Sequence, residues 1–305
     1  MSNNIPWVEK YRPTDFDSII LNNENKILFN EILNKNIFPN ILLYGPPGTG
    51  KTTTIINIIN KYQKINNQQD KSLIIHLNAS DDRGIDTIRN NISQFVNSTN
   101  LFIKGVKFII LDEVDYMTKN AQQALKQLIK INNENIRYCL ICNYISKIDE
   151  TLLDEFIVIR FNQLPNDLIF KFLNNININE KLNMSKESIM NVKEYYNSDI
   201  RSMINYMQNN INNNKIETIT NKLHEKIFKI HTTKTLLDFC EIIYSTSKKL
   251  LIDYRIIVKK YIGYLIEFKI DIINDKNIRP DLQFVYNNIN INNTITYLFY
   301  LLSNK

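Results

Sequence analysis

The stretch Gly45-Pro46-Pro47-Gly48-Thr49-Gly50-Lys51-Thr52 contains three of the six glycines of this 305-residue chain. It directly follows the apolar run 41–44 and precedes a helix-compatible apolar segment, 55–59. Glycines allow a tight turn whose N–H groups face an anion, the lysine neutralises the β and γ phosphates, and the Thr52 hydroxyl can ligate Mg²⁺. A strand, a loop and a helix in this order predict a binding site for a nucleoside triphosphate.

Length and composition are those of an ordinary soluble protein. A chain of 305 residues can form two or three domains, each with its own core. Hydrophobic residues make up 44% of the chain and charged residues 22%, which is usual for globular proteins. The N-terminus lacks the apolar core of a signal peptide, and no apolar run approaches the ~18 residues of a membrane span. We therefore expect an intracellular, soluble protein without a membrane partner.

The net charge of +6 is concentrated in the last part of the chain. Residues 215–305 contain 14 Lys and Arg against 9 Asp and Glu, whereas residues 1–214 contain 23 against 22. Bulk charge therefore does not predict a nucleic-acid surface on the nucleotide-binding part. Any DNA contact there has to come from the local arrangement of basic residues.

Three cysteines, Cys139, Cys142 and Cys240, fit a reducing compartment. The first two form a CxxC pair inside the strand-like run 137–142. Residues three apart on a strand point to opposite faces, so one metal ion could not easily bind both. The sequence favours core packing of these thiols over a metal or redox site.

Residues 1–160 alternate strand-like and helix-like segments. The helix expected over 120–131 repeats apolar residues at the helical period, and the expected strands are 41–44, 73–77, 107–111, 137–142 and 157–161. This alternation predicts an α/β domain with a parallel sheet covered by helices and with ligands at the carboxyl ends of the strands. Past Pro165 only helical segments follow, with a break near 209–215. We expect an α/β domain at 1–161, a small helical domain at 162–214 and a C-terminal helical domain at 215–305.

The run Phe108-Ile109-Ile110-Leu111-Asp112-Glu113 supplies the partner that a phosphate-binding loop needs. The apolar strand places Asp112 to hold Mg²⁺, and Glu113 is placed to polarise the attacking water. An isolated acidic cluster at a strand end is often a solvated turn, but its pairing with the glycine-rich loop favours catalysis. Asn143, at the end of the next strand, could hydrogen-bond the γ phosphate or the water. By themselves Asn143 and Arg201 would be a strand-end cap and a helix-surface arginine.

Several stretches together resemble the small subunits of replication factor C, the sliding-clamp loader of eukaryotes and archaea. The resemblance covers residues 6 to about 207. In chain order it rests on Pro6-Trp7-Val8-Glu9-Lys10-Tyr11-Arg12-Pro13, the glycine-rich loop with Thr53, the segments 77–85, 111–115, 117–125 and 141–144, and Asp199-Ile200-Arg201. The first box and Asn78-Ala79-Ser80-Asp81 are more specific than the generic nucleotide motifs. Residues 215–305 carry no distinctive motif, and only their helical character is similar to a clamp-loader collar.

The resemblance implies an AAA+ ATPase with a helical lid and a collar, working in a five-membered hetero-oligomeric ring. Such a ring uses ATP to open a sliding clamp and hold it on primer–template DNA, and hydrolysis then releases the loader. The family pattern places Val8, Tyr11 and Arg12 beside the adenine and makes Asn143 and Arg201 the two sensors of the phosphates. It also suggests Arg83 and Arg89 as contacts to DNA phosphates, without base reading.

Two departures from the family pattern stand out. The family usually has Ser-Arg-Cys beyond the first sensor, and its arginine enters the neighbouring subunit's ATP site; the corresponding position here is Glu155. Because a carboxylate would repel the γ phosphate, we expect that this subunit does not serve a neighbour's site in the usual way. Second, the family usually places further lysines where Asn91 and Ser93 stand, which predicts a weaker local DNA contact.

Three functions fit these observations. The first is an ATPase subunit of a clamp loader, which Glu113 favours. The second is a structural subunit that binds ATP and shapes the ring without useful turnover. The third is another DNA-dependent AAA+ machine: the N-terminal box argues against a branch-migration motor, whereas a loader of a different clamp, such as a checkpoint clamp, fits. The compartment would be a nucleus, an archaeal cytoplasm or a viral replication site.

Overall fold

The computed structural model describes residues 5–80, 85–97, 105–131, 135–211, 219, 221–275, 277–288 and 293–302. The chain forms two compact units. The first comprises Met1–Ile176 and Tyr196–Ile204, and the second comprises Asn177–Tyr195 and Asn205–Lys305. Each unit is described by itself below.

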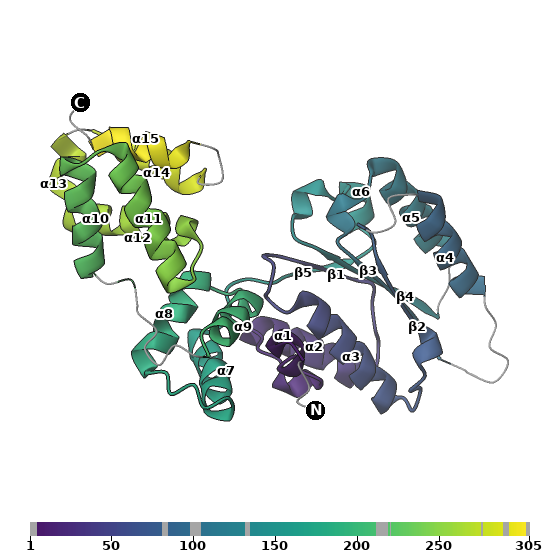
Figure 1. The fold of residues 1–305 in the computed structure, drawn as a ribbon. Helices are drawn as coiled ribbons and strands as arrows, with labels where there is room; N and C mark the ends of the chain where they lie inside the picture. Colours follow the sequence, from purple (N-terminus) through teal and green to yellow (C-terminus); the bar gives the residue numbers. More distant parts are fainter. Residues whose placement is uncertain are drawn as a thin grey trace. The chain divides into compact units, whose positions relative to one another are not determined.

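A five-stranded parallel sheet forms the centre of the first unit (Figure 1). Its strand order is β2-β3-β4-β1-β5. The strands are β1 (Ile41–Tyr44), β2 (Ile74–Asn78), β3 (Lys107–Asp112), β4 (Ile136–Cys142) and β5 (Ile157–Arg160). The predicted α/β fold with a parallel sheet is therefore confirmed, and the strand bounds differ from the expected ones by one residue or none.

Helices cover both faces of this sheet, which explains why its central strands β1, β3 and β4 are largely apolar and buried. Alternate residues of β1 show the two faces: Ile41 and Leu43 belong to one buried core, and Leu42 belongs to the other. The first core includes residues of α2 (Asn23–Lys35) and α3 (Lys51–Ile65), and the second includes residues of α4 (Ile85–Asn97), α5 (Lys119–Ile131) and α6 (Glu150–Leu153). The short helix α1 (Trp7–Lys10) precedes them all.

The two cysteines of the CxxC pair lie on opposite faces of the sheet, as expected. Cys139 packs into the core that includes α3, and Cys142 packs into the core that includes α5. Burial raises the pKa of the Cys139 thiol well above its usual range and raises the pKa of Cys142 to about 12. Both thiols are therefore protonated apolar packing groups at neutral pH.

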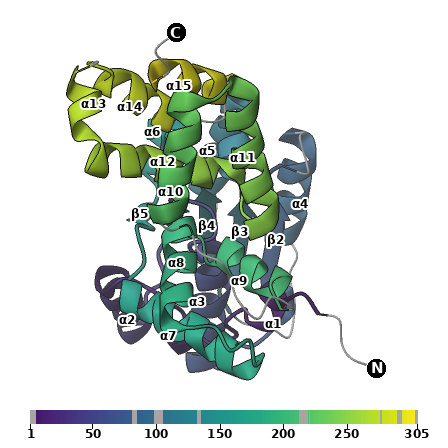
Figure 2. The same ribbon diagram turned by 60° about the vertical axis from the view of Figure 1, so that its left-hand side comes forward.

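The second unit is helical. Its helices are α8 (Lys186–Tyr196), α10 (Asn221–Thr233), α11 (Leu236–Leu250), α12 (Tyr254–Phe268), α13 (Ile270–Asp275), α14 (Arg279–Asn287) and α15 (Thr294–Leu302) (Figure 2). Their core contains Phe239, Tyr261 and Leu298, all with no exposed surface. The helices α7 (Asn166–Asn179) and α9 (Ile200–Asn209) each contribute residues to both units. The division at 161/162 and 214/215 stays a prediction. Among the described helices, none has the length and apolar character needed to cross a bilayer.

Candidate functional site

The glycine-rich loop follows β1 and leads into α3. Gly45, Gly48 and Gly50 have φ values of 144°, 72° and 89°, a region that favours glycine over other residues. At Gly48 a Cβ atom would also collide with the carboxylate of Asp199. The Gly48 carbonyl accepts a hydrogen bond from the backbone N–H of Ile200 at 3.1 Å. The loop is therefore fixed against the start of α9, and a side chain at position 48 would disrupt this contact.

Lys51 is the first residue of α3, and its ammonium group lies inside the loop. It is 7% exposed, and its Nζ donates to the carbonyls of Gly45 (2.7 Å) and Pro46 (2.8 Å) and to Asn143 Oδ1 (3.0 Å). Burial lowers the pKa of Lys51, and the nearby Asp112 opposes that shift. Asn143, at the end of β4, is thus connected to the loop lysine by a direct hydrogen bond.

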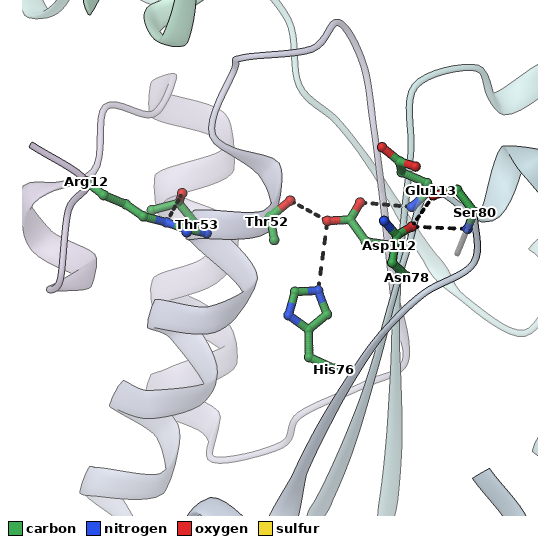
Figure 3. A network of polar contacts seen from close by, with 8 residues as sticks. All are labelled: Arg12, Thr52, Thr53, His76, Asn78, Ser80, Asp112 and Glu113. Atoms are coloured by element: carbon green, nitrogen blue, oxygen red, sulfur yellow. Dashed lines mark hydrogen bonds and ion pairs between the residues drawn. The ribbon is translucent and has the colours of Figure 1, made fainter. Parts of the chain in front are cut away.

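Thr52, Asp112 and Glu113 lie together at the carboxyl end of β3 (Figure 3). The Thr52 hydroxyl donates to Asp112 Oδ2 at 2.7 Å, and the Glu113 backbone N–H donates to Asp112 Oδ1 at 2.9 Å. Glu113 has φ 56° and ψ 38°, the left-handed region, which costs a non-glycine residue about 1–2 kcal/mol. Hydroxyl and carboxylate oxygens are the donors that Mg²⁺ prefers, so Thr52 and Asp112 fit the predicted metal-binding role.

Asp115 supports this site and was not predicted from the sequence. It is 5% exposed, and its Oδ1 accepts a hydrogen bond from the backbone N–H of Asn143 at 3.4 Å. Within the described residues its Oδ2 has no hydrogen-bond partner. A buried carboxylate that contacts a neighbouring strand end is costly unless the surroundings compensate its charge. Lys51 is a nearby cation, and Asp115, like Asp112, opposes the lowering of the Lys51 pKa by burial. The acidic run after β3 was the only sequence signal that pointed to it.

One pocket of the first unit brings most of the predicted nucleotide residues together. Besides the loop and the catalytic candidates, the lining includes apolar residues that were not predicted as site residues: Ile19, Ile20, Phe172, Ile200 and Ile204. The predicted residues that line it are Val8, Tyr11, Arg12, Pro47, Gly48, Thr49, Gly50, Lys51, Thr52, Thr53, Asp112, Glu113, Asn143 and Arg201. Gly45 and Pro46 do not line it and instead hold Lys51 through their carbonyls. The apolar lining offers a surface for a nucleobase.

The segment expected beside the adenine is tied to α3. Arg12 Nε donates to Thr53 Oγ1 at 3.3 Å, and Arg12 Nη1 lies 3.5 Å from Glu9 Oε2. Pro13, which follows, accepts a hydrogen bond from Asn57 of α3 at 3.0 Å through its carbonyl. Val8, Tyr11 and Arg12 therefore line the pocket from a segment that is anchored to the helix following the phosphate loop.

Arg201 lies in the first turn of α9 and also lines the pocket. The preceding Asp199 accepts hydrogen bonds from the backbone N–H of Ser202 (3.0 Å) and from its hydroxyl (2.8 Å). The positive charge of Arg201 contributes to the lowered pKa of Lys51. With Arg12 and Lys51, Arg201 gives the pocket three cations, which suit a polyanionic ligand such as a triphosphate.

The side chains of the two predicted DNA contacts lie outside the described part of the chain. Arg83 falls in 81–84, outside the described residues, and Arg89 belongs to α4 while its side chain lies outside the described part. Unlike these two arginines, Glu155 has a side chain that the structure describes. It follows α6, its side chain is 29% exposed, and its Oε1 lies 3.7 Å from Lys130 Nζ of α5. Glu155 is therefore paired with a cation of its own unit.

Known proteins resemble this chain over a large part of its length. Residues 41–164 match the family model "ATPase family associated with various cellular activities (AAA)". Replication factor C subunit 3 of Saccharomyces cerevisiae and subunit 5 of Homo sapiens are each 40% identical over 205 residues, 67% of this chain and 59% and 60% of theirs. Replication factor C small subunit 2 of Pyrobaculum islandicum is 37% identical over 202 residues, 66% of this chain and 62% of its own length. The aligned region thus spans about 60% of these relatives.

A solved structure supports the fold. The Thermotoga maritima RuvB Holliday junction branch migration motor has a TM-score of 0.55 at 15% identity, covering 85% of this chain and 80% of its own. At that identity the likeness concerns architecture alone. Together the comparisons confirm the resemblance to replication factor C small subunits and the AAA P-loop fold that the motifs predicted.

Proposed function

We propose that this protein is an ATPase subunit of a replication factor C-like clamp loader, which opens a sliding clamp and loads it onto primed DNA during replication. The observation that carries the proposal is the convergence of Lys51, Asn143, Thr52, Asp112 and Glu113 on one pocket. A nucleotide-binding module without turnover needs a phosphate-binding lysine and a metal-binding carboxylate, but it has no need of Glu113. The similarity to replication factor C subunits supplies the clamp-loading role.

Each residue has a distinct task in this proposal. The loop N–H groups and Lys51 bind the β and γ phosphates, while Thr52 and Asp112 hold Mg²⁺. Glu113 accepts a proton from the attacking water, and Asn143 orients that water or the γ phosphate from the end of β4. Arg201 adds positive charge from α9. The cofactors are ATP and Mg²⁺, and the oxygen donors at the end of β3 fit the ion.

The partners follow from the same proposal. The subunit would work in a five-membered ring with a large subunit and other small subunits, and the ring would bind a sliding clamp and primer–template DNA. Residues 215–305 would form the collar through which subunits assemble, after a lid at 162–214. Such a complex would act in the nucleus of a eukaryote, in an archaeal cytoplasm or at a viral replication site.

Replacing Glu113 by Gln tests the proposal most directly. The change keeps the size of the side chain and removes its basicity, so ATP should bind as before while turnover at this site stops. Lys51→Ala should instead weaken ATP binding, because it removes the cation that the loop holds. Single-turnover hydrolysis in the assembled ring, with nucleotide affinity measured on the same samples, separates the two effects. Glu24→Gln, on an exposed position of α2, is the matched control.

The second function is a subunit that binds ATP without useful turnover, and it is kept because Glu155 shows that at least one shared ATP site is altered. In the family, the arginine at this position enters the ATP site of the neighbouring subunit. A subunit that lacks this arginine departs from that arrangement. Unchanged turnover at this subunit's own site in the Glu113→Gln ring would contradict the catalytic role of Glu113. Absence of turnover at that site in the wild-type ring would favour the structural function. A loader of a different clamp would give the same result as the leading proposal here, and identification of the co-purifying large subunit and clamp distinguishes the two.

A further inference from the structure

His76 lies on β2, beside the residues proposed to hold Mg²⁺ (Figure 3). Its Nε2 is 4.0 Å from Asp112 Oδ2, the same oxygen that accepts the Thr52 hydroxyl at 2.7 Å. The close-up shows the imidazole pointing from its strand toward Thr52 and Asp112. An imidazole nitrogen thus faces a hydroxyl and a carboxylate. The site therefore offers a nitrogen ligand in addition to the oxygen ligands that a magnesium site needs.

The strand register fixes this arrangement. In the parallel pairing of β2 with β3, His76 is opposite Ile110, and Asn78 is opposite Asp112. Side chains two residues apart on a strand share a face, so His76 and Asp112 project from the same face of the sheet. Ile110 on that face packs into the core that includes α3. The position of His76 therefore depends on backbone pairing in the sheet and not on a loop.

We propose that His76 is a nitrogen ligand for the divalent cation at Thr52 and Asp112, and that it makes this site favour Mn²⁺ or Co²⁺ over Mg²⁺. The proposal rests on the nucleotide binding proposed above and concerns the cation of that same site. Mg²⁺ takes oxygen ligands and suits nitrogen poorly, whereas imidazole stabilises later divalent metals in the order of their general affinity. A histidine at this place would therefore change cation preference rather than simply add charge.

The distances permit this role. Two ligands that each lie ~2.1 Å from a cation are at most ~4.2 Å apart, and the measured separation of 4.0 Å is within that limit. The His76 side chain is 40% exposed and that of Asp112 is 21% exposed, so a hydrated cation can reach both. His76 does not line the nucleotide pocket, so its imidazole would approach the cation from outside that pocket. If His76 and Asp112 formed only an exposed ion pair, that pair would contribute little to stability.

Isotope labelling offers a direct test, because the chain has only three histidines. The full-length protein is labelled with ¹⁵N-histidine and bound to Mn²⁺ and the non-hydrolysable analogue AMP-PNP. Pulsed electron paramagnetic resonance should then detect a ¹⁵N coupling of a directly bound nitrogen. In labelled His76→Ala the coupling should vanish, although His224 and His231 in the second unit still carry the label. The two retained histidines are thus an internal control.

Cation affinities provide the second readout. With AMP-PNP present, His76→Ala and His76→Gln should weaken Mn²⁺ binding by about tenfold or more, the scale on which metal sites lose affinity when a supporting residue is removed, and weaken Mg²⁺ binding by less than about threefold. Absence of a histidine coupling, or an equal loss for both cations, would overturn the proposal. Equal loss would mean that His76 only positions Asp112. Failure to bind AMP-PNP at all would instead contradict the nucleotide site itself.

Discussion

Both units of this protein bury polar side chains, but they use them differently. In the first unit Lys51, Asp115 and Asn143 converge at the carboxyl ends of β3 and β4 and beside the phosphate loop. In the second unit His231 connects helices: its Nδ1 lies 2.9 Å from Tyr261 Oη, and its Nε2 lies 3.0 Å from the carbonyl of Phe299. Lys51 and Asn143 line the nucleotide pocket, whereas His231 is hydrogen-bonded within the core of its own helices.

This difference explains why the sequence predicts much more about the first unit than about the second. A site that binds phosphates and activates water restricts residue type at fixed spacings, and such restrictions leave motifs. A helical core restricts only size and apolarity, which many sequences satisfy. The family model accordingly matches residues 41–164, within the first unit. We infer that chemistry is concentrated in the first unit and that the second contributes structure and assembly.

The largest expected effect concerns the first unit and its neighbours. The purified single subunit should hydrolyse ATP poorly, because its site needs an arginine from an adjacent subunit and Glu155 cannot supply one to another copy. Adding the partner subunits, the clamp and primed DNA should raise the rate by about 10³–10⁵, the scale of an arginine finger. Steady-state phosphate release measures this increase in rate. Robust hydrolysis by the monomer would show that the first unit is complete by itself.

Much of the first unit follows from the sequence alone. The central strands β1, β3 and β4 were predictable because both of their faces are covered, so each is a short, largely apolar run. Thr52 and Asp112 were predictable because parallel strands and the loop end at one edge of the sheet. The contacts of Asp115 and His76 were not, since they depend on which strand neighbours which and in what register. Phe172 and Ile204 line the pocket from α7 and α9 but belong to none of the motifs, and in the sequence alone apolar residues of a helix indicate only core packing.

The next prediction concerns the second unit and the pH dependence of the free energy of unfolding. His224 of α10 is 6% exposed, and within the described residues neither ring nitrogen has a hydrogen-bond partner. Burial, aided by the charge of Lys260, lowers the pKa of His224 from 6.5 to about 4. The unfolded chain therefore binds a proton below pH 6.5, while the folded chain does so only near pH 4. The free energy of unfolding should fall by about 3 kcal/mol across that interval.

The variant His224→Phe isolates this contribution. Phe keeps an aromatic ring beside Tyr264, whose ring centroid lies 5.1 Å from that of His224. Because the ring can no longer be protonated, the variant should lose the His224 part of the pH dependence, measured as the difference from wild type in denaturant unfolding at several pH values. ATP affinity should stay the same in both proteins at neutral pH. A loss of ATP affinity in His224→Phe would contradict the separation of roles between the two units.

The expected effect on DNA binding is smaller, and it again concerns residues of the first unit. If Arg83 and Arg89 contact phosphates, replacing both by Ala should weaken binding of the assembled loader to primer–template DNA regardless of sequence. The slope of log affinity against log salt should fall by up to ~0.9 for each duplex phosphate that the variant no longer neutralises. ATP affinity, measured in parallel, should not change. Full DNA affinity with an unchanged salt slope would make both arginines solvated surface charges.

The smallest expected effect concerns Glu155, where this chain departs most from the family pattern. The Asp154-Glu155 pair beside a neighbour's triphosphate would place anions next to anions, at a cost on the order of several kcal/mol in a low-dielectric cleft. Glu155 is instead 3.7 Å from Lys130 of its own unit. We therefore propose that this edge faces no occupied ATP site. The subunit would then stand at the ring edge, where no finger is required.

Glu155→Arg tests this placement. We expect hydrolysis by the assembled ring to change by less than about twofold, far below the ~10³–10⁵ of an arginine finger, because the new arginine would meet no triphosphate. It would stand beside Lys130 and weaken local packing only slightly, as surface charge changes do. Glu150→Arg, on an exposed position of α6, is the matched control for adding an arginine to this segment. A large gain in rate from Glu155→Arg alone would place the residue against a neighbour's nucleotide, and the first unit would then lack a finger that its partner needs.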